Sequence, residues 1–119
     1  MFLNYGKNRI AQMIGGSTLG SIAQILIGTG SSTISVTDTA LTAASDRQLA
    51  TSIVFPSARN IQYQFNWNSV EMSGTSLKEF ALVESGAALT GSIWTRDVIP
   101  ALTFDGTNEL RIRYNLEVF

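Results

Sequence analysis

The chain of 119 residues contains no cysteine and no histidine, and only two prolines. The absence of cysteine excludes disulfide bonds, zinc–thiolate sites and a cysteine nucleophile. The absence of histidine removes the commonest general base, the commonest transition-metal ligand and the side chain that titrates near neutral pH. Most familiar hydrolase mechanisms are therefore closed to this chain, and we expect no catalytic residue, no metal site and no cofactor.

Charge is scarce as well. Charged residues make up 14% of the chain, against about 25% in an average soluble protein. Eight basic and nine acidic residues give a net charge of −1, so the positive surface that nucleic-acid binding requires is missing. In place of charge the chain carries 13 Ser, 12 Thr and ten Gly. A neutral surface of this kind suits a protein that is covered by neighbours, so we expect a homo-oligomer that does not bind nucleic acid.

Long hydrophobic runs are also absent. A membrane-spanning helix needs about 18–20 consecutive apolar residues, and no segment reaches that length. The N-terminal segment has Lys7 and Arg9 inside its apolar stretch rather than before it, which does not fit a signal peptide. We therefore expect no membrane partner and synthesis in a cytosol-like compartment.

Apolar residues recur at every second position in the C-terminal half, which is the period of a strand with one buried face. This alternation predicts strands over 61–68 and 109–118, and further strands are expected over 22–28, 49–55, 77–84 and 92–98. We expect Pro56 and Pro100 to limit two of these strands and residues 33–36 to form a short strand. Residues 41–50 are expected to be a crossing loop or a helical turn, 85–91 a hairpin or longer loop, and 105–108 a turn. The fold class is predicted to be all-β, an antiparallel β-sandwich of jelly-roll type.

The first twenty residues follow no such period, because glycines interrupt an otherwise apolar stretch. We interpret residues 1–20 as an extended N-terminal arm or an edge segment, with a short helix over 8–14 as an option, and residues 21–119 as a single β-sandwich domain. An apolar end of this kind would dock on its own domain or on a neighbour. Its candidate assembly contacts are Phe2, Leu3, Tyr5, Ile10, Met13 and Ile14.

Two other kinds of site are open to the sequence. Two carboxylates suffice for glycoside hydrolysis without histidine, and the candidates are Glu71, Glu79, Glu84 and Asp97. Each has a simpler explanation as a solvated or ion-paired side chain. Alternatively, Trp94 beside Arg96 and Asp97 forms a candidate recognition site, since an exposed tryptophan can stack on a sugar ring. The loops at Thr37–Asp38–Thr39 and Asp105–Gly106 are weak candidates for Ca²⁺, with no EF-hand pattern.

Several short motifs follow one another in a set order along residues 22–119. A strand ends in Gly28–Thr29–Gly30, Thr37–Asp38–Thr39–Ala40–Leu41 and Arg47 follow, and the alternating strand 61–67 precedes Leu77–Lys78–Glu79–Phe80–Ala81–Leu82 and Arg96–Asp97–Val98. This order resembles small virion proteins of tailed bacteriophages. The chain departs from that pattern in its apolar first twenty residues and in Phe80, where a small residue is expected.

The resemblance implies a non-enzymatic β-sandwich module that works in many copies in the virion and is synthesised in the cytoplasm of the bacterial host. Its leading form is a capsid decoration or cement protein, with the major capsid protein as partner. The alternatives are a tail, neck, baseplate or fibre component bound to tail or neck proteins, or a receptor- or glycan-binding module.

Overall fold

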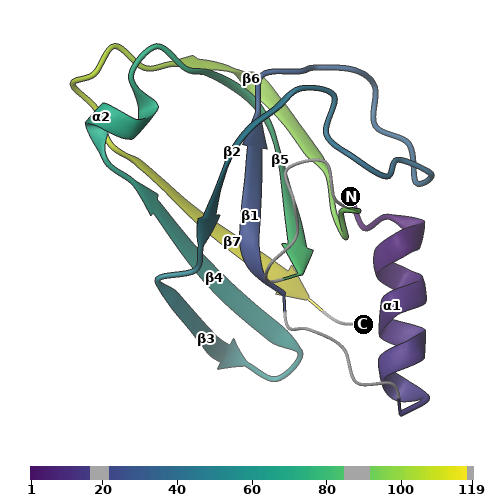
Figure 1. Cartoon of the computed structure of the whole chain (residues 1–119). Coiled ribbons are helices and arrows are strands. Elements are labelled where there is room, and N and C mark those ends of the chain that lie inside the picture. The colour runs from purple at the N-terminus through teal and green to yellow at the C-terminus, as the bar shows by residue number, and fades with distance from the viewer. Residues whose placement is uncertain (17–21, 85–91, 118–119) are drawn as a thin grey trace.

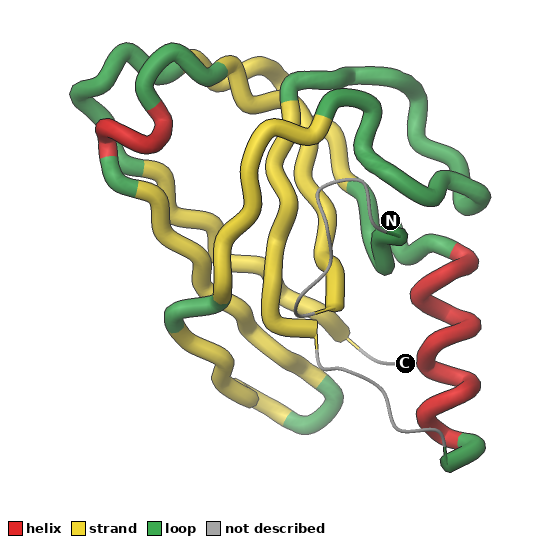
Figure 2. Tube along the Cα trace, in the orientation of Figure 1, coloured by secondary structure: helices red, strands yellow, loops and turns green. Residues whose placement is uncertain are grey.

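Strands dominate the computed structural model, which describes residues 1–16, 22–84 and 92–117. Within these ranges the elements are α1 (Asn4–Ile14), β1 (Ile22–Gly28), β2 (Ala44–Leu49), β3 (Ser52–Ser57), β4 (Asn60–Trp67), α2 (Ser69–Met72), β5 (Ser76–Glu84), β6 (Asp97–Thr103) and β7 (Leu110–Glu117). They form two antiparallel sheets with strand orders β2-β1-β5-β6 and β3-β4-β7 (Figures 1 and 2). The all-β, sandwich-like fold expected from the sequence is confirmed, whereas jelly-roll connectivity is not.

The strands predicted from alternation lie where they were expected. β4 buries Tyr63, Phe65 and Trp67, while the amides between them face outward. β7 pairs with β4 in unbroken register from Asn60↔Glu117 to Trp67↔Leu110. The turn at 105–108 is also present, with the N–H of Thr107 donating to Oδ1 of Asp105 and Gly106 at a positive φ; the hairpin or loop expected over 85–91 lies outside the described residues.

The core occupies both faces of the larger sheet. Ile25 and Ile27 of β1 face the second sheet, where they pack with Phe65 and Trp67. Leu26 of β1 lies on the opposite face, in a second cluster with Ala81, Val83, Leu3, Leu41 and Ile93. β1 and β5 are therefore buried on both sides, because the N-terminal segment and the β1–β2 loop (residues 29–43) cover the face that points away from the second sheet.

Four local predictions are wrong. Residues 44–49 form strand β2 rather than a loop, because they pair with β1 from Gln24↔Leu49 to Gly28↔Ala44. Residues 33–36 lie in the irregular β1–β2 loop, and β6 begins at Asp97 rather than at 92. Neither proline ends its strand, because β3 and β6 are both edge strands and each has a register shift around its proline. An edge position tolerates the missing N–H.

The extended N-terminal arm is not confirmed. Phe2 forms a β-bridge to Thr95, and Leu3 is fully buried, so the first three residues belong to the sandwich. Residues 4–14 then form α1, which lies beside the sheets (Figure 1). A side chain on Gly6 would come within 2.8 Å of the carbonyl oxygen of Trp94, so glycine lets the start of the helix cross close to the chain. No helix in the described residues is long and apolar enough to span a membrane.

Substitution of Phe65 tests whether the core lies between the two sheets. The side chain is fully buried and stacks on Tyr63 with ring centroids 6.2 Å apart. We expect Phe65→Ala to lower the free energy of unfolding by about 3–5 kcal/mol, because a large cavity replaces the ring. Urea denaturation of both proteins measures this difference. Ile53→Ala is the matched control, since that side chain is 43% exposed; equal losses in the two variants would contradict the core assignment.

Candidate functional site

A buried group of charges lies under the β1–β2 loop. Arg96 is 1% exposed and Glu79 is 0% exposed. Nη2 of Arg96 lies 3.0 Å from Oε2 of Glu79, and Nη1 lies 3.0 Å from Oδ2 of Asp38. We call these three residues the Arg96 cluster. Full burial of an ion pair is costly unless further hydrogen bonds satisfy both partners.

The loop supplies those hydrogen bonds. Nη2 of Arg96 also donates to Ser32 and to the hydroxyl of Thr42. Glu79 accepts from the backbone N–H groups of Gly30, Thr42 and Ala43, at 2.8–3.2 Å. Both members of the pair therefore contact the loop, and the loop is held against β5 by its own backbone.

Two glycines make room for the carboxylate. A Cβ at Gly28 would lie 2.7 Å from Oε1 of Glu79, and a Cβ at Gly30 would lie 2.8 Å from the same atom. The Gly28–Thr29–Gly30 motif therefore allows the chain to pass directly over Glu79. Gly28, Gly30, Asp38, Glu79 and Arg96, which come from four of the motifs named in the sequence analysis, therefore meet in this one place although they are far apart in the sequence.

The charges of the Arg96 cluster are fixed by their surroundings. Burial would raise the pKa of Glu79, but hydrogen bonds from Ala43, Arg96 and Thr42 outweigh it and hold that pKa below its ordinary value. The backbone N–H of Ser35, followed by Arg96, lowers the pKa of Asp38. Both carboxyl groups are therefore ionised at neutral pH. Glu79 is a structural anion here, and its oxygens face loop N–H groups and Arg96 rather than an open substrate site.

The other candidate carboxylates also have structural contacts. Glu71 completes a capping box with Asn68 at the start of α2. Glu84 binds Arg9 through two hydrogen bonds and accepts a third from Nε1 of Trp94. Asp97 accepts from the hydroxyl of Tyr114 at 2.7 Å. Across residues 1–16, 22–84 and 92–117, no group of three or more acidic side chains could hold a metal ion.

The proposed recognition residues are not an exposed patch. Trp94 and Arg96 are each 1% exposed, so that prediction is wrong for both, and Asp97 is only partly exposed. Trp94 packs edge-on against Phe2, with ring centroids 6.4 Å apart. The physical reason is the N-terminal segment, which pairs with Thr95 and covers the tryptophan. The burial of Trp94 counts against a sugar-stacking role for it.

Two open recesses on the described surface could take a small ligand. One has a volume of about 440 Å³ and is lined by Asn66, Trp67, Asn68, Glu109, Leu110 and Arg111. The Trp67 ring is 1% exposed, so the recess offers amides and charges without an aromatic platform. A second recess of about 420 Å³ opens between β6 and β7 beside Tyr114.

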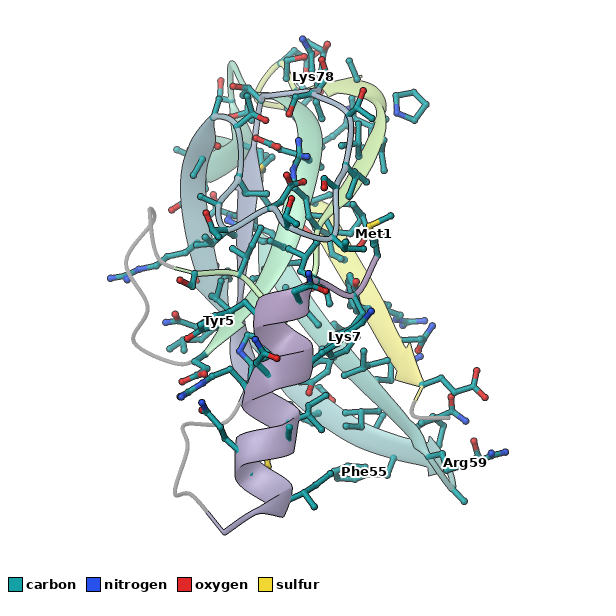
Figure 3. The ribbon with its side chains drawn as sticks, turned by 90° about the vertical axis from the view of Figure 1, so that its right-hand side faces the viewer. Met1, Tyr5, Lys7, Phe55, Arg59 and Lys78 are labelled. Atoms are coloured by element: carbon teal, nitrogen blue, oxygen red, sulfur yellow. The ribbon has the colours of Figure 1, made fainter. Side chains whose placement is uncertain are left out.

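The candidate assembly contacts separate into two groups. Phe2 and Leu3 pack inside the domain, and Tyr5 and Ile10 are half-buried. Met13 and Ile14, at the end of α1, are 48% and 83% exposed. Figure 3 shows α1 with Tyr5 and Lys7 on its upper half. The helix is attached through its beginning and through Arg9, so its last turn projects with two apolar side chains uncovered.

Sequence reasoning missed a second exposed apolar element, strand β3. All six of its residues are exposed, including Ile53, Val54 and Phe55. Figure 3 places Phe55 and the following turn residue Arg59 at the end of the molecule away from Lys78. The run Ile53–Val54–Phe55 has no alternation, which is also how a strand buried on both faces reads. The position of β3 beyond the edge of the other sheet shows that it is exposed on both faces rather than buried on both.

No protein-family model, curated protein sequence or solved structure matches this chain.

Substitution of Arg96 tests how much the buried ion pair with Glu79 contributes to stability. We expect Arg96→Met to lower the free energy of unfolding by about 3–5 kcal/mol, because Glu79 is then left charged and buried without its partner. Thermal and urea denaturation measure the loss. Arg111→Met, on an exposed position of β7, should cost less than about 1 kcal/mol. If Arg96→Met does not fold, Arg96→Lys keeps the charge and should be intermediate; similar values for Arg96→Met and Arg111→Met would refute the role of the pair.

The lowered pKa of Glu79 also predicts the response to acid. Its folded pKa lies below the ordinary value of 4.5, so its contribution to stability is fully present above about pH 4.5 and is lost as the pH falls through the folded pKa. We expect the melting temperature of the native chain to fall steeply below that pH, and that of Glu79→Gln to fall less. Glu109→Gln, which changes an exposed carboxylate, should follow the native curve. Parallel curves for the native chain and Glu79→Gln would contradict the prediction.

Proposed function

We propose that this chain is a structural, non-enzymatic protein of a tailed-bacteriophage virion, and that it decorates or cements the capsid shell. The proposal rests mainly on the contrast between the charged interior of the domain and the exposed apolar residues of α1 and β3. The buried charges hold the domain together, whereas exposed apolar side chains stand on the last turn of α1 and on β3. This arrangement suits a rigid body that makes contacts with other proteins.

The neutral composition supports the same role. A surface of hydroxyls, amides and apolar groups can be covered by neighbours without desolvating many charges. Each contact is small, but repeated attachment raises the effective concentration for the next contact, so no single interface has to be strong. Four of the motifs on which the resemblance to virion proteins rests meet at the Arg96 cluster, which holds the β1–β2 loop against β5.

The position in the virion distinguishes two forms of the proposal. Electron cryomicroscopy of purified particles should show copies spread over the shell if the protein is a decoration or cement protein. Copies confined to the tail, neck or baseplate would assign it to tail assembly or host contact instead. Absence from particles would refute the structural role.

Ile14 tests whether α1 provides attachment. We expect Ile14→Asp to reduce incorporation into particles at least tenfold, because a charge replaces an apolar contact at the projecting end of the helix. Quantitative mass spectrometry of purified particles measures the copy number. Val70→Asp is the matched control, since Val70 is 80% exposed and Ile14 is 83% exposed. Equal incorporation of both variants, with unchanged melting temperatures, would contradict attachment through α1.

A further inference from the structure

Strand β3 is an uncovered edge. It is the last strand of the order β3-β4-β7, and each of its six residues is exposed. An edge strand presents unpaired N–H and C=O groups that can pair with another strand. Among the described residues no strand pairs with β3 on the side away from β4.

The exposure follows from how the sheets overlap. β2, the edge of the larger sheet, packs against β4, so β3 extends past that edge. Ile53 pairs with Tyr63, whose side chain points into the core, and Val54 pairs with Gln62 on the outer face. Ile53 therefore continues the apolar inner surface beyond the sandwich, where no second sheet covers it, and Phe55, in the register shift that follows Val54, is 72% exposed.

Charge distinguishes β3 from the other three edges of the described sheets. β2 carries Asp46 and Arg47, β6 carries Asp97, and β7 carries Arg111, Arg113 and Glu117. β3 has no charged residue. Natural edge strands are commonly protected by charges, whereas here the edge is interrupted by Pro56 and by the register shift between Val54 and Ser57. This strand is therefore the one that can approach another strand without bringing charges together.

We propose that β3 pairs antiparallel with β3 of a second copy of this chain, about a two-fold axis at Val54. In this register Val54 faces Val54 of the second copy. Ile53 of each copy faces Phe55 of the other, which gives two such pairs. Aromatic and β-branched side chains are favourable cross-strand pairs. The two three-stranded sheets then join into one six-stranded sheet, and the inner apolar surfaces of both copies become continuous.

The charged residue that lies nearest to β3 in the sequence favours the antiparallel arrangement. Arg59, in the turn between β3 and β4, is exposed and has a positive φ of 69°. Parallel pairing would place the two Arg59 side chains next to each other, whereas antiparallel pairing places them at opposite ends of the shared strands. A second copy is therefore a suitable partner, because its β3 brings apolar side chains and no charge against the first β3.

The contact is small, because a specific stable interface buries about 800 Å² per partner and a six-residue strand supplies only part of that area. The pair is therefore expected to form at high protein concentration or on a particle, where many copies are held together. The proposal rests on the proposed virion role for its biological setting, while the pairing itself rests on β3.

The absence of cysteine makes a direct test practical, since any disulfide must come from an introduced residue. Val54→Cys should form a disulfide-linked dimer under mild oxidation at least tenfold faster than Val70→Cys or Leu102→Cys, whose positions are 80% and 50% exposed. Non-reducing gel electrophoresis of the purified full chain over a concentration series measures the rates. A mixture of Ile53→Cys and Phe55→Cys should link to each other faster than either links to itself.

Sedimentation analysis provides a second readout without cysteine. Val54→Lys should remain monomeric at concentrations where the native chain forms dimers, and Val70→Lys should behave like the native chain. Equal cross-linking rates for the three single-cysteine positions, or preferential linking at position 102, would overturn the proposal. Because these assays use the isolated chain, dimers through β3 without incorporation into particles would refute only the virion role, and incorporation without β3 cross-links would refute only the pairing.

Discussion

The ion pair between Arg96 and Glu79 is the interaction on which the rest of the structure depends. Neither charge is exposed to water, so each requires the other together with hydrogen bonds from the β1–β2 loop. That requirement holds the loop against β5. The loop and the N-terminal segment in turn cover the second apolar cluster, on the face of β1 and β5 that points away from the smaller sheet. One buried pair thereby turns a two-sheet sandwich into a domain with apolar packing on both sides of its larger sheet.

The same region anchors the start of the chain. Phe2 pairs with Thr95, directly beside Arg96, and packs against Trp94. Arg9 and Trp94 both bind Glu84 at the end of β5. α1 is therefore attached to a rigid base at its beginning and projects at its end. A helix held in this way presents Met13 and Ile14 in a defined direction at little entropic cost to a binding partner.

The surface completes the mechanism that we propose. Charged side chains are few, and several of them form contacts inside the domain, so the outside consists mainly of neutral groups with apolar residues on α1 and β3. Burial of neutral surface avoids the desolvation penalty of charges. Repetition over many copies then provides strength that a single small contact lacks. A decoration or cement protein would work through these properties, and the uncovered edge of β3 would connect copies to each other.

Alternation in the sequence by itself determined the strands of the core, because a half-buried strand must place apolar residues at every second position. Residues 61–67 and 110–117 are examples, and the all-β class followed mainly from them, whereas the strand over 22–28 was expected from a consecutive apolar run. Only the tertiary structure decided β2, which has no apolar alternation and becomes a strand by pairing with β1. The tertiary structure also decided that Trp94 and Arg96 are buried. Phe2, near the start of the chain, covers Trp94, and the β1–β2 loop covers Arg96. Ile53, Val54 and Phe55 show the same limit: their apolar run fits a strand buried on both faces or exposed on both, and burial is set by what packs across from a strand, which local sequence does not encode.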